Sequence, residues 1–292
     1  MIDTLSQYSV LSLYSAMAIY AIAFVLFTID LAGKATEGTF SGKFQRIAMA
    51  LTWLAFVLQL AATILRGVAA SRVPWATMYE FAMTGTLIIT AVFLVANLKW
   101  NLRFVGTFST GLTLVLLGLA ATRYYVEIVP LPPALQSYWL VIHVFVATLA
   151  TGFFSLGFSL SLLQLLQQRR EVAVHDGKKT RLTGLVKLPD AVALENYAYR
   201  LIIIGFIFWT FTLIAGAIWA DKAWGRYWGW DTKEVWTFII WTIYAGYIHA
   251  RATRGWRGTR SAVLALVGFG AVMFNFTVVN IFFKGLHAYS GL

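Results

Sequence analysis

The chain has no cysteine among its 292 residues and few charged residues. The lack of cysteine excludes disulfides, iron–sulfur ligation, a thiolate nucleophile and a prosthetic group attached through sulfur. Charged residues make up 12% of the chain, about half the share found in soluble domains, while 60% of the residues are hydrophobic. We therefore expect no long soluble domain, and the composition is typical of a membrane protein.

Long apolar runs recur along the whole chain. Each is long enough to cross about 30 Å of hydrocarbon. Because lipid offers no partner for a free backbone group, such runs are expected to be helices. The sequence therefore predicts an all-α membrane protein, a polytopic bundle of about eight transmembrane helices. The runs are 10–31, 47–67, 78–98, 104–122, 139–166, 201–219, 234–250 and 261–284. The first ten residues carry Asp3 but no Lys or Arg, so the first run is expected to be a retained helix rather than a secretory signal.

The basic residues are divided unequally between the two sets of joining loops. Loops 32–46, 99–103, 167–200 and 251–260 hold 16 Lys and Arg residues, and the other side holds 7. By the positive-inside rule the first set is cytoplasmic, which predicts both termini on the outer side. This asymmetry explains the net charge of +11 without nucleic acid. The connector 167–200, which contains His175, is expected to be a solvated link.

Tryptophan is concentrated in one predicted outer loop, 219–236. Six of the twelve tryptophans lie within 23 residues, where an even spread would place about one. An aromatic belt at the membrane interface would spread its rings over many helix ends. Here the rings crowd one loop beside Arg226 and Lys233, which favours a binding site for a large, flat, anionic ligand. The six are Trp219, Trp224, Trp228, Trp230, Trp236 and Trp241.

Asp231 and Glu234 are spaced as a helix cap. Asp231 directly precedes an apolar run, and Glu234 follows three residues later. This spacing resembles a capping box with Asp in place of the usual Ser or Thr. We therefore expect a helix that begins at about Thr232.

Three histidines are expected at membrane depth. His143 lies one turn into the fifth predicted helix, and His287 follows the eighth, so both should lie near the tryptophan loop. Imidazole is a standard axial ligand of haem iron, and an ionisable group at membrane depth is a functional candidate. The pair is therefore predicted to bind haem iron. His249 lies roughly 26 Å along its helix from Thr232, near the cytoplasmic side, with no histidine at its own depth. It is either structural or needs a ligand from a second chain.

The segment 224–236, WGRYWGWDTKEVW, resembles the tryptophan-rich motif of the membrane proteins that handle haem in cytochrome c maturation. Downstream, His249 with Arg251, the run 255–258, Asn280 and the run 285–287 are similar to the system II cytochrome c synthesis proteins of the CcsA or ResC type. The outer segment with Pro74, Met78, Tyr79 and Glu80 is also similar. The resemblance covers roughly 73–292. In one departure, Thr232 replaces the usual Pro; both residues suit a first helical position.

The resemblance implies a division of roles. Haem b would enter near His249, move to the outer face and be held there by His143 and His287. It would then be joined to the cysteines of CxxCH motifs in apocytochromes c, which makes the chain part of a holocytochrome c synthase. The implied partners are a second membrane subunit of the CcsB or ResB type with a large outer domain, and indirectly thiol-reducing proteins. The implied location is a bacterial inner membrane or a thylakoid-type membrane, with the active face periplasmic.

The expected site combines these predictions. Binding residues are His143, His287, His249, Trp224, Arg226, Trp228, Trp230, Asp231 and Trp236, with iron bound by the three histidines. No catalytic acid or base stands out, since Glu80 and Asp231 both have structural interpretations. Arg72, Arg226 and Lys233 are candidates to pair with haem propionates.

Two alternatives and a domain division remain open at the level of sequence. Residues 1–70 are expected to form an N-terminal helix pair and 71–292 the haem-handling core. A membrane b-type cytochrome usually places His pairs on facing helices inside the bundle, and no such pair at matching depth is evident. The other alternative is a non-catalytic haem chaperone or regulator of the same superfamily. Only the presence of all three histidines favours the synthase over this alternative.

Overall fold

The computed structural model describes residues 2–33, 42–128, 130–131, 133–180, 182–283 and 285–287. Within these ranges every regular element is a helix, which confirms the all-α class. The long helices are α1 (Ile2–Ala32), α2 (Lys43–Ala70), α3 (Met78–Lys99), α4 (Gly106–Arg123), α5 (Tyr138–His175), α6 (Ala191–Trp224), α7 (Thr232–Arg254) and α8 (Thr259–Phe274). The short elements are η1 (Arg103–Val105), η2 (Pro133–Leu135), η3 (Thr183–Lys187), the π-helical η4 (Asn275–Val279) and α9 (Asn280–Phe282).

Seven of the described helices are long and apolar enough to span a membrane. The eighth predicted span corresponds to α7, which is long enough but less apolar. The reason is its composition, because Trp236, Thr237, Trp241, Tyr244 and similar residues interrupt the aliphatic ones. The chain is thus a multi-pass membrane protein with seven or eight long helices.

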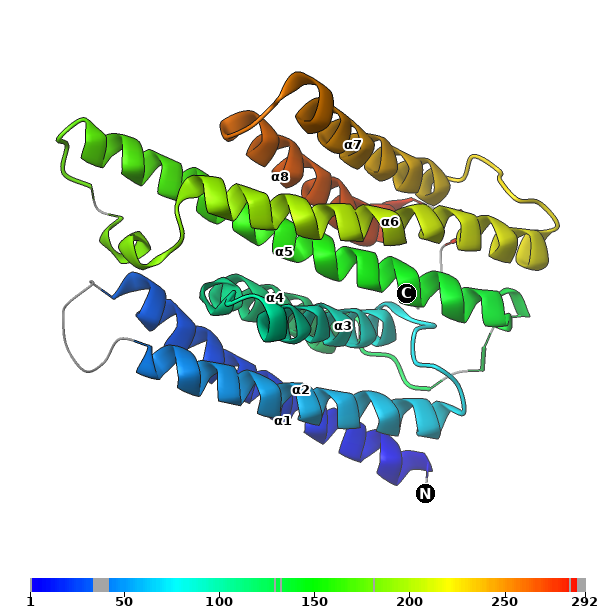
Figure 1. Ribbon diagram of the computed structural model, residues 1–292. Coiled ribbons are helices and arrows are strands. Elements are labelled where there is room, and N and C mark those ends of the chain that lie inside the picture. Colours follow the sequence, from blue (N-terminus) through cyan, green and yellow to red (C-terminus); the bar gives the residue numbers. More distant parts are fainter. Residues whose placement is uncertain are drawn as a thin grey trace.

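The helices lie roughly along one direction, and their connections alternate between two ends (Figure 1). The turns after α2, α4 and α6 gather at one end, which we call the α6–α7 loop end. The turns after α1, α3, α5 and α7 lie toward the other end. This alternation is the one expected for a polytopic bundle. The outward orientation of both termini stays a prediction.

Two packed groups of helices are joined by a further cluster in which α5 meets α1, α2 and α3. One core cluster joins buried residues of α1, α2, α3 and α4, for example Tyr20, Ala55 and Met83. Another joins α5, α6, α7 and α8, for example Phe154, Ile202 and Tyr244. The helix pair α1–α2 therefore packs against the rest through α3 and α4. Its treatment as a separate unit, 1–70, stays a prediction.

Buried ion pairs tie the helices together at each end. At the α6–α7 loop end, Glu80 of α3 binds Arg66 at 3.0 Å and Arg72 at 2.6 Å. At the other end, Arg251 of α7 binds Glu195 of α6 at 2.8 Å. Breaking such a buried pair typically costs about 3–5 kcal/mol, because an uncompensated charge is left behind. Glu80 therefore has a structural role, as the partner of two arginines.

The helices run further than the apolar pattern indicates. α5 continues to His175 and α6 begins at Ala191, so only 176–190 separates them and the predicted connector 167–200 is too long. α6 also continues to Trp224, so the tryptophan loop is 225–231 rather than 219–236. Apolar runs end at the first charged residues, whereas a helix continues through them once it has left the hydrocarbon.

Candidate functional site

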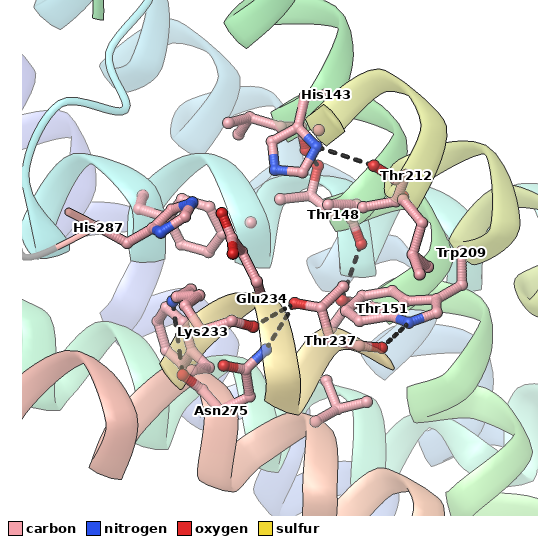
Figure 2. Close-up of a pocket in the computed structure, with 18 of the residues that line it drawn as sticks. His143, Thr148, Thr151, Trp209, Thr212, Lys233, Glu234, Thr237, Asn275 and His287 are labelled. Carbon is pink, nitrogen blue, oxygen red and sulfur yellow. Dashed lines mark hydrogen bonds between the residues drawn. The ribbon is translucent and has the colours of Figure 1, made fainter. Parts of the chain in front are cut away.

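A pocket opens between α3, α4, α5, α6, α7 and the α8–η4 segment near the α6–α7 loop end (Figure 2). It holds about 1190 Å³ of space not filled by atoms, part of it continuous with the outside. The pocket is open to the outside and is lined by side chains from six helical segments, which is the usual form of a ligand site. Most of the wall is apolar, including Phe81, Ile89, Leu116, Val144 and Val272. The few polar groups in the wall therefore determine which ligand the pocket can bind.

His143 is held in the wall from α5. The side chain of Ser137 accepts a hydrogen bond from the Trp139 amide, and α5 begins at Tyr138. One turn later, Nδ1 of His143 lies 3.0 Å from the carbonyl oxygen of Thr212 on α6. No described residue hydrogen-bonds its Nε2, the ring nitrogen that remains available to a ligand. The neutral ring with a proton on Nδ1 fits this contact.

Gly216 makes room for this imidazole. A Cβ at that position would lie 2.8 Å from Cε1 and 2.9 Å from Nδ1 of His143. The ring of His143 also stacks on Trp219 of α6, with centroids 5.8 Å apart. The position of His143 thus depends on one missing side chain and one large ring of the same helix.

His287 reaches the same pocket from the segment that follows α9 (Figure 2). Its Nδ1 lies 3.2 Å from Oδ1 of Asp231. Oδ2 of Asp231 accepts the Leu286 amide at 2.8 Å, and a Cβ at Gly285 would overlap this carboxylate. As with His143, no described residue hydrogen-bonds Nε2 of His287. A carboxylate on Nδ1 is the arrangement that fixes the tautomer and raises the basicity of metal-binding histidines.

Asp231 is at the same time the N-cap of α7, as predicted. Its Oδ1 accepts the Lys233 amide at 2.9 Å, and Oε2 of Glu234 accepts the Asp231 amide at 3.0 Å, which completes the capping box. The hydrogen bond from His287 lowers the pKa of the Asp231 carboxyl to about 2, against the opposing effect of burial. The amides of Lys233 and Leu286 act in the same direction as His287. The carboxylate is therefore ionised and bound on several sides.

Trp219 and Trp224 of α6 pack against the histidine rings from outside the pocket lining. The Trp219 ring lies 5.4 Å from the ring of His287, in addition to its stacking on His143. The Trp224 ring lies 4.8 Å from Trp219 and 4.8 Å from His287. Both imidazoles therefore contact a single indole, that of Trp219. This residue was part of the predicted cluster but was not singled out as a site residue.

The other predicted tryptophans have different environments. Trp228 lines the pocket. Trp230 is 77% exposed and has φ of 60°, a left-handed backbone that turns it away, with its ring edge-on to Trp228 at 5.9 Å. Trp236 packs on Phe274 of α8 at 4.3 Å and lies outside the pocket wall. Of these three, only Trp228 lines the pocket, and Trp209 of α6, which was not among the predicted residues, lines it as well.

The two arginines considered for a ligand are engaged with carboxylates. Arg72 binds Glu80. Arg226 lies 3.8 Å from Oε1 of Glu234, and its guanidinium occupies the space that a Cβ at Gly229 would fill. Among the described residues of the pocket wall, Lys233 is the only lysine or arginine. Glu234 also lines the wall, and its buried Oε1 has no hydrogen-bond partner among the described residues.

Sequence reasoning gave no prominence to Asn275. This residue is buried, lines the pocket and opens the π-helical turn η4. Its carbonyl oxygen accepts a hydrogen bond from Lys233 Nζ at 3.4 Å. π-helical turns are frequent at functional sites. No local sequence signal indicates such a turn, so only the structure reveals this contact.

His249 lies outside the pocket, toward the other end of α7. It is exposed, and no described residue hydrogen-bonds its ring. Seventeen residues separate it from Thr232, roughly 26 Å along a helix. His175 is 90% exposed and lies 3.7 Å from Asp176. The structure thus brings His143 and His287 together and keeps the other two histidines apart from them.

The arrangement suits one kind of ligand. Two imidazoles line a largely apolar pocket, their Nε2 atoms have no hydrogen-bond partner among the described residues, and the indoles of Trp209 and Trp228 line the same pocket. Such a site can bind a large, flat, mostly apolar molecule that carries a metal ion able to accept two nitrogen ligands. Lys233 and Asn275 add a polar patch on the α7–η4 side of the wall (Figure 2).

Residues 73–287 match the protein family described as Cytochrome C assembly protein. Among similar proteins are those named Cytochrome c biogenesis protein CcsA. The one from Guillardia theta is 36% identical over 234 residues, which cover 75% of this chain and 77% of that protein. That from Thermosynechococcus vestitus is 34% identical, with 84% and 86% covered. That from Prochlorococcus marinus is 30% identical, with 92% of both chains covered.

A solved structure has a similar fold. The protein titled Cytochrome c Heme Lyase CcmF superposes with a TM-score of 0.69 at 20% sequence identity. The match covers 93% of this chain but only 46% of that one. At this identity the likeness establishes the fold alone. The bundle described above is thus one that a larger protein also contains.

Proposed function

The chain belongs to the Cytochrome C assembly protein family, as a member of the CcsA type, and we propose that it binds haem between His143 and His287 and presents it for attachment to apocytochromes c. A role in cytochrome c maturation follows from the family. The proposal adds the ligand, its site and the direction in which it is delivered.

The observation that carries the proposal is that the two imidazoles have the same pattern of hydrogen bonding. Each Nδ1 has an oxygen partner, Thr212 for His143 and Asp231 for His287, both rings line the pocket, and neither Nε2 has a hydrogen-bond partner among the described residues. Iron in a porphyrin has two axial positions, for which neutral imidazole is a standard ligand. The indoles of Trp209 and Trp228, which line the pocket, suit the flat macrocycle.

The chemistry of attachment belongs to haem and to the thiols of the apocytochrome. Each thioether forms when a cysteine S–H adds across a haem vinyl group: sulfur bonds to one vinyl carbon and the hydrogen ends on the other. Nothing is oxidised or reduced by another reactant. The chain would contribute binding and orientation, as proteins do for such cofactors. In this proposal it acts as part of a lyase-type complex, with the apocytochrome as second substrate.

The proposal extends to transport and to a partner. His249 would be a ligand at an entry site on the cytoplasmic side, and the second ligand there would come from a membrane subunit of the CcsB or ResB type. The exposed position of His249 on α7 supports this, since it leaves the ring accessible to a second chain. The active face would be the periplasmic side of an inner or thylakoid-type membrane.

The test of the outer site is spectroscopic. The purified chain, or its complex with the partner subunit, should carry six-coordinate haem with a bis-imidazole spectrum. Either His143→Ala or His287→Ala should open one coordination position that added imidazole fills. His175→Ala, which removes an exposed histidine far from the pocket, is the matched control and should leave the spectrum unchanged. A wild-type spectrum in both single pocket variants would overturn the axial assignment.

Transfer distinguishes this function from that of a resident electron-transfer haem. Co-expression with a CxxCH apocytochrome and the partner subunit should give covalent haem on the apocytochrome, and His287→Ala should lower its yield. A b-type cytochrome would show the same bis-imidazole spectrum and yield no covalent product. That outcome would replace the present proposal.

A further inference from the structure

Lys233 occupies an unusual place in the pocket wall. It is the second residue of α7, directly after the N-terminal Thr232, and its side chain lies along the α7–η4 side of the pocket (Figure 2). The remainder of the described wall contains neither arginine nor another lysine. A single positive charge in a largely apolar pocket has a strong influence on which ligand binds and in which orientation.

The ammonium group is held by two neutral oxygens. Nζ donates to the carbonyl oxygen of Asn275 at 3.4 Å and to Oδ1 of Asn280. Asn280 is itself oriented, because its Nδ2 donates to the carbonyl oxygen of Phe276 at 2.8 Å. The π-helical turn and the residue that follows it therefore direct two oxygen acceptors toward one side chain.

Neither acceptor neutralises the charge. A lysine ammonium has three N–H donors, and the described residues accept two of them. No carboxylate of the described residues lies within 4.0 Å of Nζ, in contrast to Arg72, with Glu80, and Arg226, with Glu234. A charge removed from water is costly unless it is paired. The third donor, and the lack of a carboxylate in direct contact with Nζ among the described residues, both point to an anionic group on the ligand.

We propose that Lys233 binds a carboxylate of the ligand, and that Asn280 positions the ammonium for this contact. The identity of the ligand rests on the proposed function: haem carries two propionate carboxylates on one edge. The propionate edge then faces α7 and η4, and Arg72 and Arg226 take no part. Lys233 therefore determines which way round the flat molecule enters the pocket.

The test compares two probes that differ at the propionate groups, which are charged in one and esterified in the other. Haem and haem dimethyl ester, whose propionates are esterified, are titrated into the purified, haem-depleted full chain and followed by absorbance. Lys233→Met should weaken haem binding about tenfold and change ester binding less than twofold. Lys233→Arg should restore most of the haem affinity. Asn280→Ala should cause a smaller loss that is again confined to haem.

Lys222→Met is the matched control. Lys222 lies in the last turn of α6, is 60% exposed and is 3.7 Å from Asp221, so it should affect neither probe. An equal loss of both probes in Lys233→Met would show a purely structural role and overturn the inference, as would unchanged haem affinity. Failure of the proposed haem binding gives a different result, because the wild-type chain would then bind neither probe.

Discussion

At the scale of single residues, Asp231 connects three parts of the site. It caps α7, holds the backbone of Leu286 and accepts a hydrogen bond from His287. The first task is general, since Asp and Asn are equally good N-caps. The third needs a carboxylate, because a neutral amide does not raise the basicity of imidazole in the same way. The two tasks can therefore be separated by one substitution.

Asp231→Asn should preserve the fold and weaken haem binding. We expect the cap itself to change by only a few tenths of a kcal/mol, with a further loss of stability near neutral pH because the favourable contacts of the ionised carboxylate are removed. Haem affinity should fall about 10–100-fold, as is common when the hydrogen-bond partner of a metal-binding histidine is altered. Thermal unfolding and haem titration measure the two effects. Asp190→Asn is the control, because Asp190 caps α6 through Ala193 without contacting a histidine. Equal haem affinities in the two variants would contradict the role given to Asp231.

The same pair of variants gives a pH signature. The folded pKa of Asp231, about 2, lies below its ordinary value of 3.8. Stability from the ionised carboxylate is therefore fully present above about pH 4 and is lost as the pH falls toward 2. The stability difference between wild type and Asp231→Asn should be constant above pH 4 and shrink below it. A constant difference down to pH 2 would show that the carboxylate gains nothing from its partners.

At the scale of elements, the close approach of α5 and α6 places the His143 ring. The ring lies over Gly216, in the space that a larger residue would occupy, and against Trp219 one turn further. Alanine is a better helix former than glycine by about 1 kcal/mol. Replacing Gly216 by alanine should therefore affect the stability of α6 and the position of the His143 ring in different ways.

Gly216→Ala should leave the bundle at least as stable and displace the imidazole. An off-rotamer side chain costs about 0.5–1.5 kcal/mol, which corresponds to a loss of up to about tenfold in haem affinity. Gly246→Ala in α7 is the matched control, because a Cβ there has no neighbour within 4 Å. Both variants should unfold at or above the wild-type temperature, and only Gly216→Ala should bind haem more weakly. A weaker Gly246→Ala variant would show that the effect is not specific to His143.

The sequence predicts the helices and the cap well, and the orientation of side chains less well. Asp231 and Glu234 form the expected capping box, because such spacing acts locally. The end of α5 at His175 lies beyond the apolar run, because a helix can continue through charged residues in water. Trp230 points outward through a positive φ, which a bulky residue seldom adopts and which no pattern indicates. The meeting of His143 and His287 in one pocket depends on long-range packing, and their role as ligands stays a prediction.

At the scale of the whole molecule, the pocket and His249 are separated by packed rings. On α7, Tyr244 lies between Thr237, the deepest pocket residue of that helix, and His249. The Tyr244 ring stacks on Phe154 of α5 with centroids 3.8 Å apart, and both side chains are fully buried. The interior between the two ends is therefore filled, and His249 contributes nothing to the pocket directly.

His249→Ala should impair haem loading without impairing the pocket. Its exposed ring has no described partner, so protein abundance and unfolding temperature should be unchanged. Haem per molecule in cells should fall, whereas the purified variant supplied with haem should show the normal bis-imidazole spectrum. Arg251→Met, two residues away, should instead lower abundance, because it breaks the buried pair with Glu195 at a cost of about 3–5 kcal/mol. Full loading of His249→Ala in cells would remove the entry site from the proposal.

The two histidines of the pocket have unequal partners, and this difference gives the site a direction. His287 donates to a carboxylate and His143 to a neutral carbonyl. The carboxylate makes His287 the more electron-rich donor to iron. If haem binds as proposed, the iron bond to His143 would be the weaker of the two and would be the first to open when another ligand competes. A haem handed over to the histidine of a CxxCH motif would exchange its His143 side first and remain tethered by His287 until the exchange is complete.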